Sequence, residues 1–195
     1  GFLAAKAKHV PHVFGPYYHP PVYGIKRWSL FMAYHMTQGL AILRFSDKVL
    51  PHTIFEKNIL RKVGCPEDNV EILPNVVDTK RFALGKKKEK IVLFVSSLIY
   101  EKGAHVALQI AEKILKERND VKFVFVGYYQ KELSGQIGRL KRSKNVKFFQ
   151  NISLSELIKL YQRASVFILP SKYEAFARVI AEAEACGCAI ISTRV

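Results

Sequence analysis

The feature that most constrains the fold is an alternation of short apolar runs with longer amphipathic segments, from residue 91 to the end of the chain. The apolar runs are too short to be helices, and they lack the polar alternation of a half-exposed strand. Each run is followed by a segment with helical spacing of its apolar residues. This pattern predicts a doubly wound α/β domain, whose parallel sheet is covered on both faces. The predicted strands are 91–97, 121–127, 146–150, 165–171 and 189–193, and the predicted helices are 104–117, 131–142, 154–164 and 177–185.

Local signals mark the ends of two of these helices. Ser153 and Glu156 have the spacing of a capping box at the start of helix 154–164. Gly187 follows helix 177–185, at the place where a left-handed residue commonly ends a helix. Both signals agree with the helix boundaries that the apolar pattern predicts.

The chain before residue 81 repeats the alternation less clearly. Its candidate strands are 9–15, 47–52 and 70–74, and its candidate helices are 26–44 and 54–63. The basic run GKKKEK, at residues 85–90, is interpreted as a solvated linker between the two parts. We therefore predict a first domain over residues 1–80, a basic linker over 81–90 and a second domain over 91–195.

The formal net charge of +15 bears on the partners of the chain. A strongly basic protein suits nucleic acid, anionic lipid or phosphorylated small molecules, and charge alone does not choose among them. No RNA-binding or DNA-binding motif accompanies the charge, which speaks against nucleic acid. The three cysteines have neither the even count of a disulfide framework nor the spacing of zinc ligands, which indicates a reducing, cytoplasmic compartment.

The longest apolar stretch bears on membrane contact. It runs from Trp28 to Leu43 and falls short of the roughly 20 residues that a membrane-spanning helix needs. Lys26, Arg27 and Arg44 flank it, as in helices that lie on an anionic membrane surface. A peripheral contact with a membrane therefore stays open.

Three loops follow predicted strands of the second domain. In a doubly wound fold, ligands bind outside the carboxyl ends of the strands. The loops that gather there are SSLIYEKG at 96–103, GYYQ at 127–130 and SKYEAFAR at 171–178. Lys102 and Gly103 stand at the start of a helix, where backbone N–H groups and the helix dipole favour an anion such as a diphosphate.

Two glutamates flank the last predicted helix. Glu174 and Glu182 are separated by seven residues. Eight helical positions rise roughly 12 Å, which exceeds the spacing of about 5 to 9.5 Å in a glycosidase acid pair. The two carboxylates could instead hold hydroxyls at opposite ends of a sugar nucleotide, with its diphosphate between them.

The same segment carries a resemblance to a known family. PSKYEAFARVIAEAEACGCAIIST, at residues 170–193, resembles the group 1 glycosyltransferases, which are retaining enzymes of the GT-B fold with two Rossmann-like domains. VSSLIYEKG resembles the phosphate loop of the family, and VEILPNVVDTKRF its interdomain segment. FSDKVLPHT and PYYHP are similar to segments of its acceptor domain. These matches cover nearly the whole chain, in the order of the family.

The resemblance implies a role for individual residues. Glu174 and Lys102 would be catalytic, with Glu174 at hydroxyls of the donor sugar and Lys102 at the leaving diphosphate. Glu182 would bind the ribose of the nucleotide, and His19 would be the acceptor-side histidine. Ser97, Gly103, Phe176, Ala177 and Arg178 would complete the donor site, with the backbone N–H groups of Phe176 and Ala177 pointing at phosphate oxygens.

The resemblance also implies the partners. The donor would be a UDP-, GDP- or ADP-sugar, the acceptor a glycan or a lipid-linked molecule, and no metal or other cofactor is expected. The alternatives are a GT-B nucleotide-sugar epimerase and a non-enzymatic module that binds nucleic acid or anionic membrane. The resemblance further implies that both domains are incomplete, the first at its start and the second at its C-terminal end.

This sequence departs from the family pattern at several positions. Ser96 and Ser97 stand where the family usually has Gly-Arg, so a second cation on the diphosphate is missing. Val76, Ala175 and Ala177 replace glycines of the pattern. These departures predict a weaker hold on the diphosphate.

Overall fold

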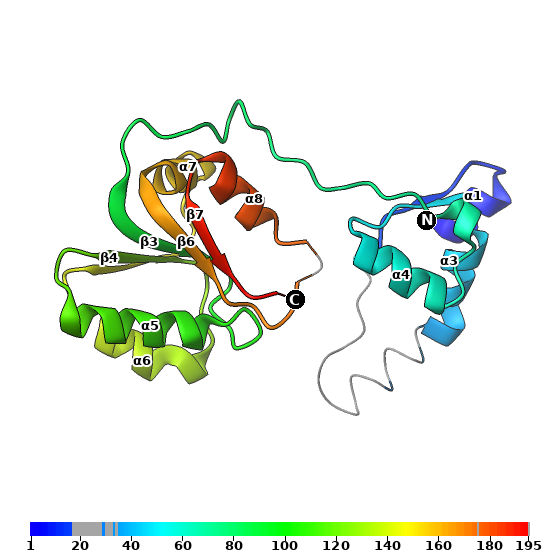
Figure 1. The fold of residues 1–195 in the computed structure, drawn as a ribbon. Helices are drawn as coiled ribbons and strands as arrows, with labels where there is room; N and C mark the ends of the chain where they lie inside the picture. Colours follow the sequence, from blue (N-terminus) through cyan, green and yellow to red (C-terminus); the bar gives the residue numbers. More distant parts are fainter. Residues whose placement is uncertain (17–28, 30–32, 34, 175, 195) are drawn as a thin grey trace. The chain divides into compact units, whose positions relative to one another are not determined.

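The chain forms two compact units, Gly1–Asn75 and Val76–Val195, with a division five residues before the predicted boundary. The computed structural model describes residues 1–16, 29, 33, 35–174 and 176–194. Figure 1 shows both units, each of which is described by itself.

The second unit is built on a five-stranded sheet in which every pairing is parallel. The strand order is β5-β4-β3-β6-β7, so the chain moves outward from β3 in one direction and then returns to its other side. This arrangement confirms the predicted doubly wound fold. The strands are β3 (Glu89–Val95), β4 (Lys122–Val126), β5 (Val146–Phe149), β6 (Ala164–Leu169) and β7 (Ala189–Ser192).

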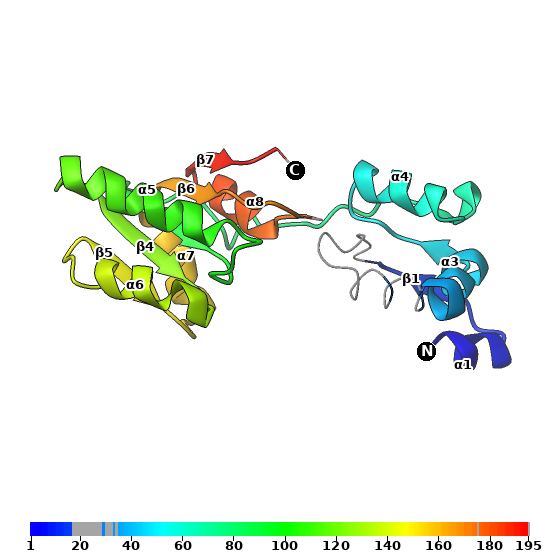
Figure 2. The same cartoon turned by 90° about the horizontal axis from the view of Figure 1, so that it is seen from below.

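Helices cover both faces of this sheet. They are α5 (Ala104–Glu117), α6 (Ser134–Leu140), α7 (Leu154–Arg163) and α8 (Arg178–Ala185). Helices α5 and α6 lie on one face, and α7 and α8 lie on the other (Figures 1 and 2). The largest buried side chains are aromatic and include Phe94, Phe123, Phe125, Phe167 and Tyr161, which fill the layers between the sheet and the helices. Cys186 and Cys188 are buried, free and part of the same core.

The helix ends follow the predicted signals. Ser153 and Glu156 form the capping box of α7 with both reciprocal hydrogen bonds. At the end of α8, the N–H of Gly187 donates to the carbonyl of Glu184 at 2.8 Å, and the N–H of Cys188 donates to that of Ala183 at 3.0 Å. These two bonds, together with a φ of 80° at Gly187, make a Schellman motif.

The predicted helix over 131–142 is divided in the structure. Residues Lys131–Leu133 form a 3₁₀ turn, and α6 begins only at Ser134. Gly135 and Gly138 lie within this helix, and glycine has a low helix propensity. Helix α6 thus covers only the middle of the predicted range, and it forms in spite of these two glycines.

The basic segment before β3 differs from the expected solvated linker. Phe82 is buried and packs against the ring of Tyr161, with ring centroids 6.1 Å apart. The Nζ of Lys88 donates to the carbonyl of Tyr161 at 3.2 Å and to that of Cys186 at 2.7 Å. The last carbonyls of a helix lack intrahelical partners, so a lysine can satisfy the ends of α7 and α8 together. Only part of the basic run faces solvent, including Lys86, Lys87 and Lys90.

The first unit is smaller, and its core contains Leu43, Val49, Leu60, Cys65 and Val70. Its strands β1 (Val13–Phe14) and β2 (Lys48–Val49) pair in parallel. The predicted strand over 70–74 makes only a single bridge, between Val70 and Val49. The helices that the structure bounds in this unit include α1 (Phe2–Ala7), which no sequence pattern predicted, α3 (Leu40–Phe45), which follows a π-helical turn over His35–Gly39, and α4 (Ile54–Lys62).

Two predictions for the first unit fall partly or wholly outside the described residues. Of the helix predicted over 26–44, the structure describes residues 29, 33 and 35–44, and His19 is not among the described residues. No helix within the described ranges has both the length and the apolar content to cross a membrane.

Candidate functional site

The carboxyl ends of β3 and β6 form the point where the strand order of the sheet reverses. β3 has β4 on one side and β6 on the other. The chain therefore leaves β3 toward one side of the sheet and leaves β6 toward the other side. Such a reversal opens a crevice at the edge of the sheet, and this is where doubly wound folds bind ligands. The two loops are residues 96–103 and 170–177, which are two of the three loops that the sequence predicted.

An ion pair joins these two loops. The Nζ of Lys102 lies 2.9 Å from Oε2 of Glu174, and the Ser171 hydroxyl donates to Oε1 of the same carboxylate at 2.8 Å. The Lys102 side chain is 31% exposed and the Glu174 side chain 15%. The N–H of Lys172 also donates to the carbonyl of Glu101 at 2.9 Å, so the backbones of the loops are joined as well. The two charges are therefore held at fixed places and are still reachable from solvent.

Gly103 sets the close approach of the two loops. Its φ is 68°, in the left-handed region, and a Cβ there would lie 1.8 Å from the carbonyl oxygen of Pro170. A distance this short allows no side chain unless the backbone moves. Glycine thus places Lys102 directly ahead of α5, which begins at Ala104.

Glu182 lies within α8, on the helix face that packs against α7. The hydroxyl of Tyr161 donates to its Oε2 at 3.1 Å, and Nε of Arg178 lies 3.5 Å from its Oε1. The Glu182 side chain is 12% exposed, and this burial raises the pKa of its carboxyl, while Tyr161 and Arg178 act in the opposite direction. Burial and the neighbouring Glu182 carboxylate also raise the pKa of Tyr161.

Glu174 and Glu182 do not lie on one helix, although the estimate of their separation from helix rise assumed that they do. Helix α8 begins at Arg178, so Glu174 precedes the helix and only part of the intervening chain is helical. The separation of the carboxylates is therefore not set by helix rise. Their different surroundings distinguish them instead: Glu174 is paired with a lysine, and Glu182 accepts from a buried tyrosine.

The segment ahead of α8 carries backbone donors. Among the described residues, the N–H groups of Phe176 and Ala177 have no hydrogen-bond acceptor, whereas the N–H of Arg178 donates to the carbonyl of Phe176 at 2.9 Å. Unpaired donors of this kind, together with a helix N-terminus, can bind an anion. Ser97 is exposed at the end of β3, and Arg178 is exposed at the start of α8.

The sequence predicted that the GYYQ loop, residues 127–130, lies near the ligand, but it assigned no role to a residue of this loop. The N–H of Leu98 donates to the carbonyl of Tyr128 at 2.7 Å, so this loop lies beside the loop of Ser97 and Lys102. The Tyr128 ring is 58% exposed, and its hydroxyl bonds to Oδ1 of Asn151, which follows β5 and has a φ of 53°. A fixed, exposed ring of this kind can stack on a planar group of a ligand.

Two further residues complete the account of the site. The sequence did not single out Ser171, although it lies three residues before Glu174 and is almost fully buried. His19, predicted on the acceptor side, lies outside the described residues. Within the described ranges, no group of three or more His, Cys, Asp or Glu side chains could hold a metal ion.

Comparison with known proteins adds to this geometry. Residues 76–195 match the family model described as glycosyl transferases group 1. An uncharacterized glycosyltransferase of Methanocaldococcus jannaschii is 32% identical over 183 residues, which are 84% of this chain and 46% of that protein. The gpi3 subunit of phosphatidylinositol N-acetylglucosaminyltransferase from Schizosaccharomyces pombe is 27% identical over 150 residues, which are 74% and 33% of the two chains.

A solved structure shares the fold. The crystal structure of Anabaena HepE in complex with UDP and glucose matches with a TM-score of 0.75 at 20% identity, over 97% of this chain and 55% of that one. The chain spans less than half the length of the two curated relatives.

Proposed function

The chain belongs to the group 1 glycosyltransferases, and we propose that its second unit holds the donor, a nucleotide-diphosphate sugar, for transfer of the sugar to an acceptor hydroxyl. The observation that carries the proposal is the pair of Lys102 and Glu174 at the reversal point of the sheet, beside the N-terminus of α5. The cation can face the negative charge that develops on the leaving phosphate. The carboxylate can face the positive charge that develops on the sugar ring.

The chemistry of the step explains why both charges are needed. When the glycosidic bond to the diphosphate breaks, negative charge grows on the leaving phosphate and positive charge grows on the sugar ring. Lys102 and the N-terminus of α5 would stabilise the phosphate, and Glu174 would hold the sugar hydroxyls. Ser171 orients the Glu174 carboxylate by its hydrogen bond. We propose retention of the anomeric configuration, with attack on the same face from which the diphosphate departs.

The remaining donor contacts follow from the site. Glu182 would accept hydrogen bonds from the ribose, and the N–H groups of Phe176 and Ala177 would donate to phosphate oxygens. Ser97 and Arg178 lie at the exposed ends of β3 and α8 and would meet the same diphosphate. These roles need no metal ion.

We expect the two glutamates to separate by ligand. Glu182→Gln should weaken binding of plain UDP or GDP by about 1 kcal/mol, because the ribose hydroxyls would then donate to a neutral amide oxygen and not to a charged carboxylate. Glu174→Gln should leave plain nucleotide affinity unchanged and lower the affinity for the nucleotide sugar. Calorimetry with nucleotide and nucleotide sugar measures both. Equal losses of plain nucleotide affinity in the two variants would remove this division of roles.

The pH dependence of stability provides an independent readout for Glu182. Because burial raises its pKa above the ordinary value of 4.5, the folded chain binds the proton more tightly than the unfolded chain. The stability that this protonation contributes is present below that value and is lost as the pH rises through the folded pKa. Glu182→Gln should therefore gain stability relative to the unmodified chain as the pH rises from 4 to 7. Urea unfolding at both pH values tests this, and a constant difference would contradict it.

The acceptor is a glycan or a lipid-linked molecule in this proposal. A relative whose name includes phosphatidylinositol supports the lipid alternative, as does the predicted basic flank of the segment 26–44. A lipid-linked acceptor would bring the protein to the cytoplasmic face of a membrane as a peripheral protein.

A thermal-shift screen with UDP-, GDP- and ADP-sugars tests the donor proposal. One of the three nucleotide sugars should raise the melting temperature of the chain, since a ligand that binds only the folded state stabilises it. The same nucleotide sugar should not shift Lys102→Ala. The absence of any shift in a folded chain would overturn the proposal.

A further inference from the structure

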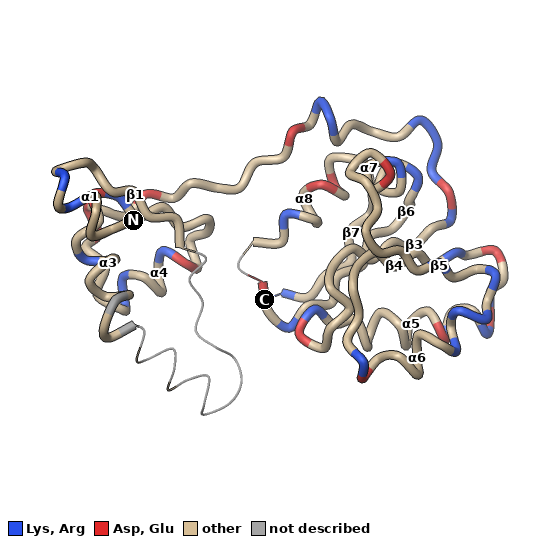
Figure 3. The backbone as a smooth tube through the Cα atoms, turned by 180° about the vertical axis from the view of Figure 1, so that it is seen from behind, with Lys and Arg blue, Asp and Glu red and all other residues tan. Residues whose placement is uncertain are grey.

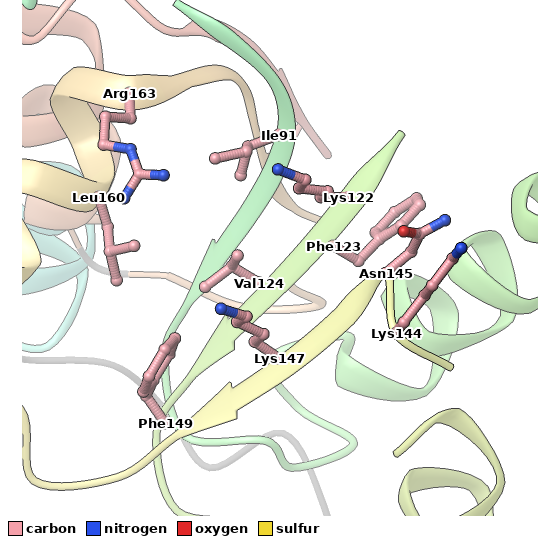
Figure 4. A pocket seen from close by; sticks show the side chains of 10 residues that line it. All are labelled: Ile91, Lys122, Phe123, Val124, Lys144, Asn145, Lys147, Phe149, Leu160 and Arg163. Carbon is pink, nitrogen blue, oxygen red and sulfur yellow. The ribbon is translucent and has the colours of Figure 1, made fainter. Parts of the chain in front are cut away.

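A pocket lies away from the loops of the proposed donor site. It has a volume of about 290 Å³ and is lined by residues of β3, β4 and β5 together with the end of α7 (Figure 4). Its apolar floor contains Ile91, Val124, Phe149 and Leu160, of which the first two are almost fully buried. This volume is near the lower end of the range for small-molecule sites.

Cations from three elements surround this floor. In Figure 4, Lys122 of β4, Lys147 of β5 and Arg163 of α7 extend over it, and Lys144 lies at the far rim. In Figure 3, several Lys and Arg segments lie at this part of the second unit, with Asp and Glu segments among them. Positive charges this near one another repel, so the arrangement favours an anion among them.

One carboxylate neutralises part of this charge. Oε1 of Glu89 lies 2.6 Å from Nε of Arg163, and its Oε2 lies 3.7 Å from Nζ of Lys122. These contacts hold the pKa of Glu89 below its ordinary value, with the Arg163 hydrogen bond as the largest cause. Lys147 has no carboxylate within ion-pair distance among the described residues. The pocket thus keeps excess positive charge.

Protection of an edge strand from pairing with other chains does not explain why Lys122, Lys147 and Arg163 lie around one pocket. Lysines on edge strands commonly block pairing with other chains, and β5 is an edge strand. Lys122, however, belongs to β4, which has a strand on either side, and Arg163 belongs to a helix. The three cations therefore all line the pocket, whereas only Lys147 lies on an edge strand.

We propose that this pocket binds a phosphorylated small molecule with an apolar body, such as an aryl or alkyl phosphate monoester. A phosphate monoester carries between one and two negative charges at neutral pH, which matches three cations and one carboxylate. Lysine and arginine donate charge-assisted hydrogen bonds to phosphate oxygens, and the apolar floor would cover the aryl or alkyl group. The pocket shares β3 with the proposed donor site, and its other strands are β4 and β5.

Phenyl phosphate is a suitable probe for this pocket. In a ¹H–¹⁵N correlation spectrum of the chain, its addition should shift the backbone signals of residues 122–124 and 145–149. Inorganic phosphate and phenol should each bind more weakly, because each supplies only one part of the ligand. Shifts confined to the Lys102 loop would overturn the proposal, since the probe would then occupy the donor site alone.

A matched pair of charge reversals isolates the pocket. Lys147→Glu should lower the affinity for phenyl phosphate by about tenfold or more, as expected for loss of a charge-assisted hydrogen bond. Lys113→Glu makes the same change of net charge at an exposed position of α5 outside the pocket, and it should leave this affinity unchanged. Equal losses in both variants would show a general charge effect and would overturn the proposal.

The donor site supplies the last control. Lys147→Glu should keep the response of the chain to the nucleotide sugar that the thermal-shift screen identifies, and excess UDP should not displace phenyl phosphate. Displacement by UDP would place the probe in the donor site and refute a second site. If the chain binds phenyl phosphate at this pocket but binds no nucleotide sugar, the donor proposal is wrong and the proposal of a phosphate-binding pocket is retained.

Discussion

Lys102→Ala is expected to lower the affinity of the chain for the proposed donor, a nucleotide-diphosphate sugar, by about 100-fold or more, as expected for charge-assisted hydrogen bonds to a diphosphate. Lys102 contributes the cation of the ion pair that joins the loops after β3 and β6. Its loss would leave the Glu174 carboxylate, which is only 15% exposed, facing an uncompensated diphosphate. Calorimetry with the nucleotide sugar measures the change.

A ligand without phosphates and a second variant test whether the diphosphate causes this loss of affinity. The nucleoside without phosphates should bind Lys102→Ala and the unmodified chain equally, which separates a phosphate effect from a fold defect. Ser97→Arg should act in the opposite direction and strengthen diphosphate binding by about 1–3 kcal/mol, because Ser97 is exposed at the end of β3 and a guanidinium can donate two bonds to a phosphate. If neither change alters the affinity in a folded protein, the diphosphate does not bind at this loop.

Gly103→Ala is expected to destabilise the chain by about 2–4 kcal/mol, the sum of a left-handed backbone cost and an overpacking cost. The added Cβ would lie 1.8 Å from the carbonyl oxygen of Pro170, and both atoms belong to backbone-anchored groups that cannot rotate away. Urea unfolding measures the change in the free energy of unfolding. The displaced loop should also weaken nucleotide-sugar binding, because Lys102 precedes Gly103.

Gly138→Ala is the matched control for this substitution. Gly138 lies within α6, and a Cβ there would meet no atom within 4 Å. Alanine should raise the free energy of unfolding by about 0.5–1 kcal/mol, because it loses less backbone entropy in a helix than glycine does. A loss of stability at both positions would show that the φ value and the contact at Gly103 are not the cause.

The sheet of the second unit could be predicted because its strands are continuous apolar runs and its helices have clear periodicity. The Ser153 capping box and the Gly187 end of α8 were also correct, since both depend on local chain geometry. The first unit was harder to predict. Its two paired strands span two residues each, which is too short for a periodic signal.

The path of a loop and contacts between distant segments account for what the sequence could not predict. The bond from Ser171 to Glu174 depends on the path of the loop after β6. The bonds of Lys88 to two helix ends depend on how α7 and α8 pack, and a run of lysines looks the same whether or not one of them is fixed. The pocket of Lys122, Lys147 and Arg163 likewise forms only when two strands and a helix come together.

The bonds of Lys88 also decide where the second unit can be cut. A shortened polypeptide that starts at the first predicted strand residue, Ile91, would lack Phe82 and Lys88. The ring of Tyr161 would lose its aromatic neighbour, and the carbonyls of Tyr161 and Cys186 would lose a donor. Glu182 bonds to that same tyrosine, so the damage would reach the helix that carries the proposed ribose ligand. A fragment that keeps the proposed donor site intact should therefore begin ahead of Phe82, near Val76, where the second unit starts.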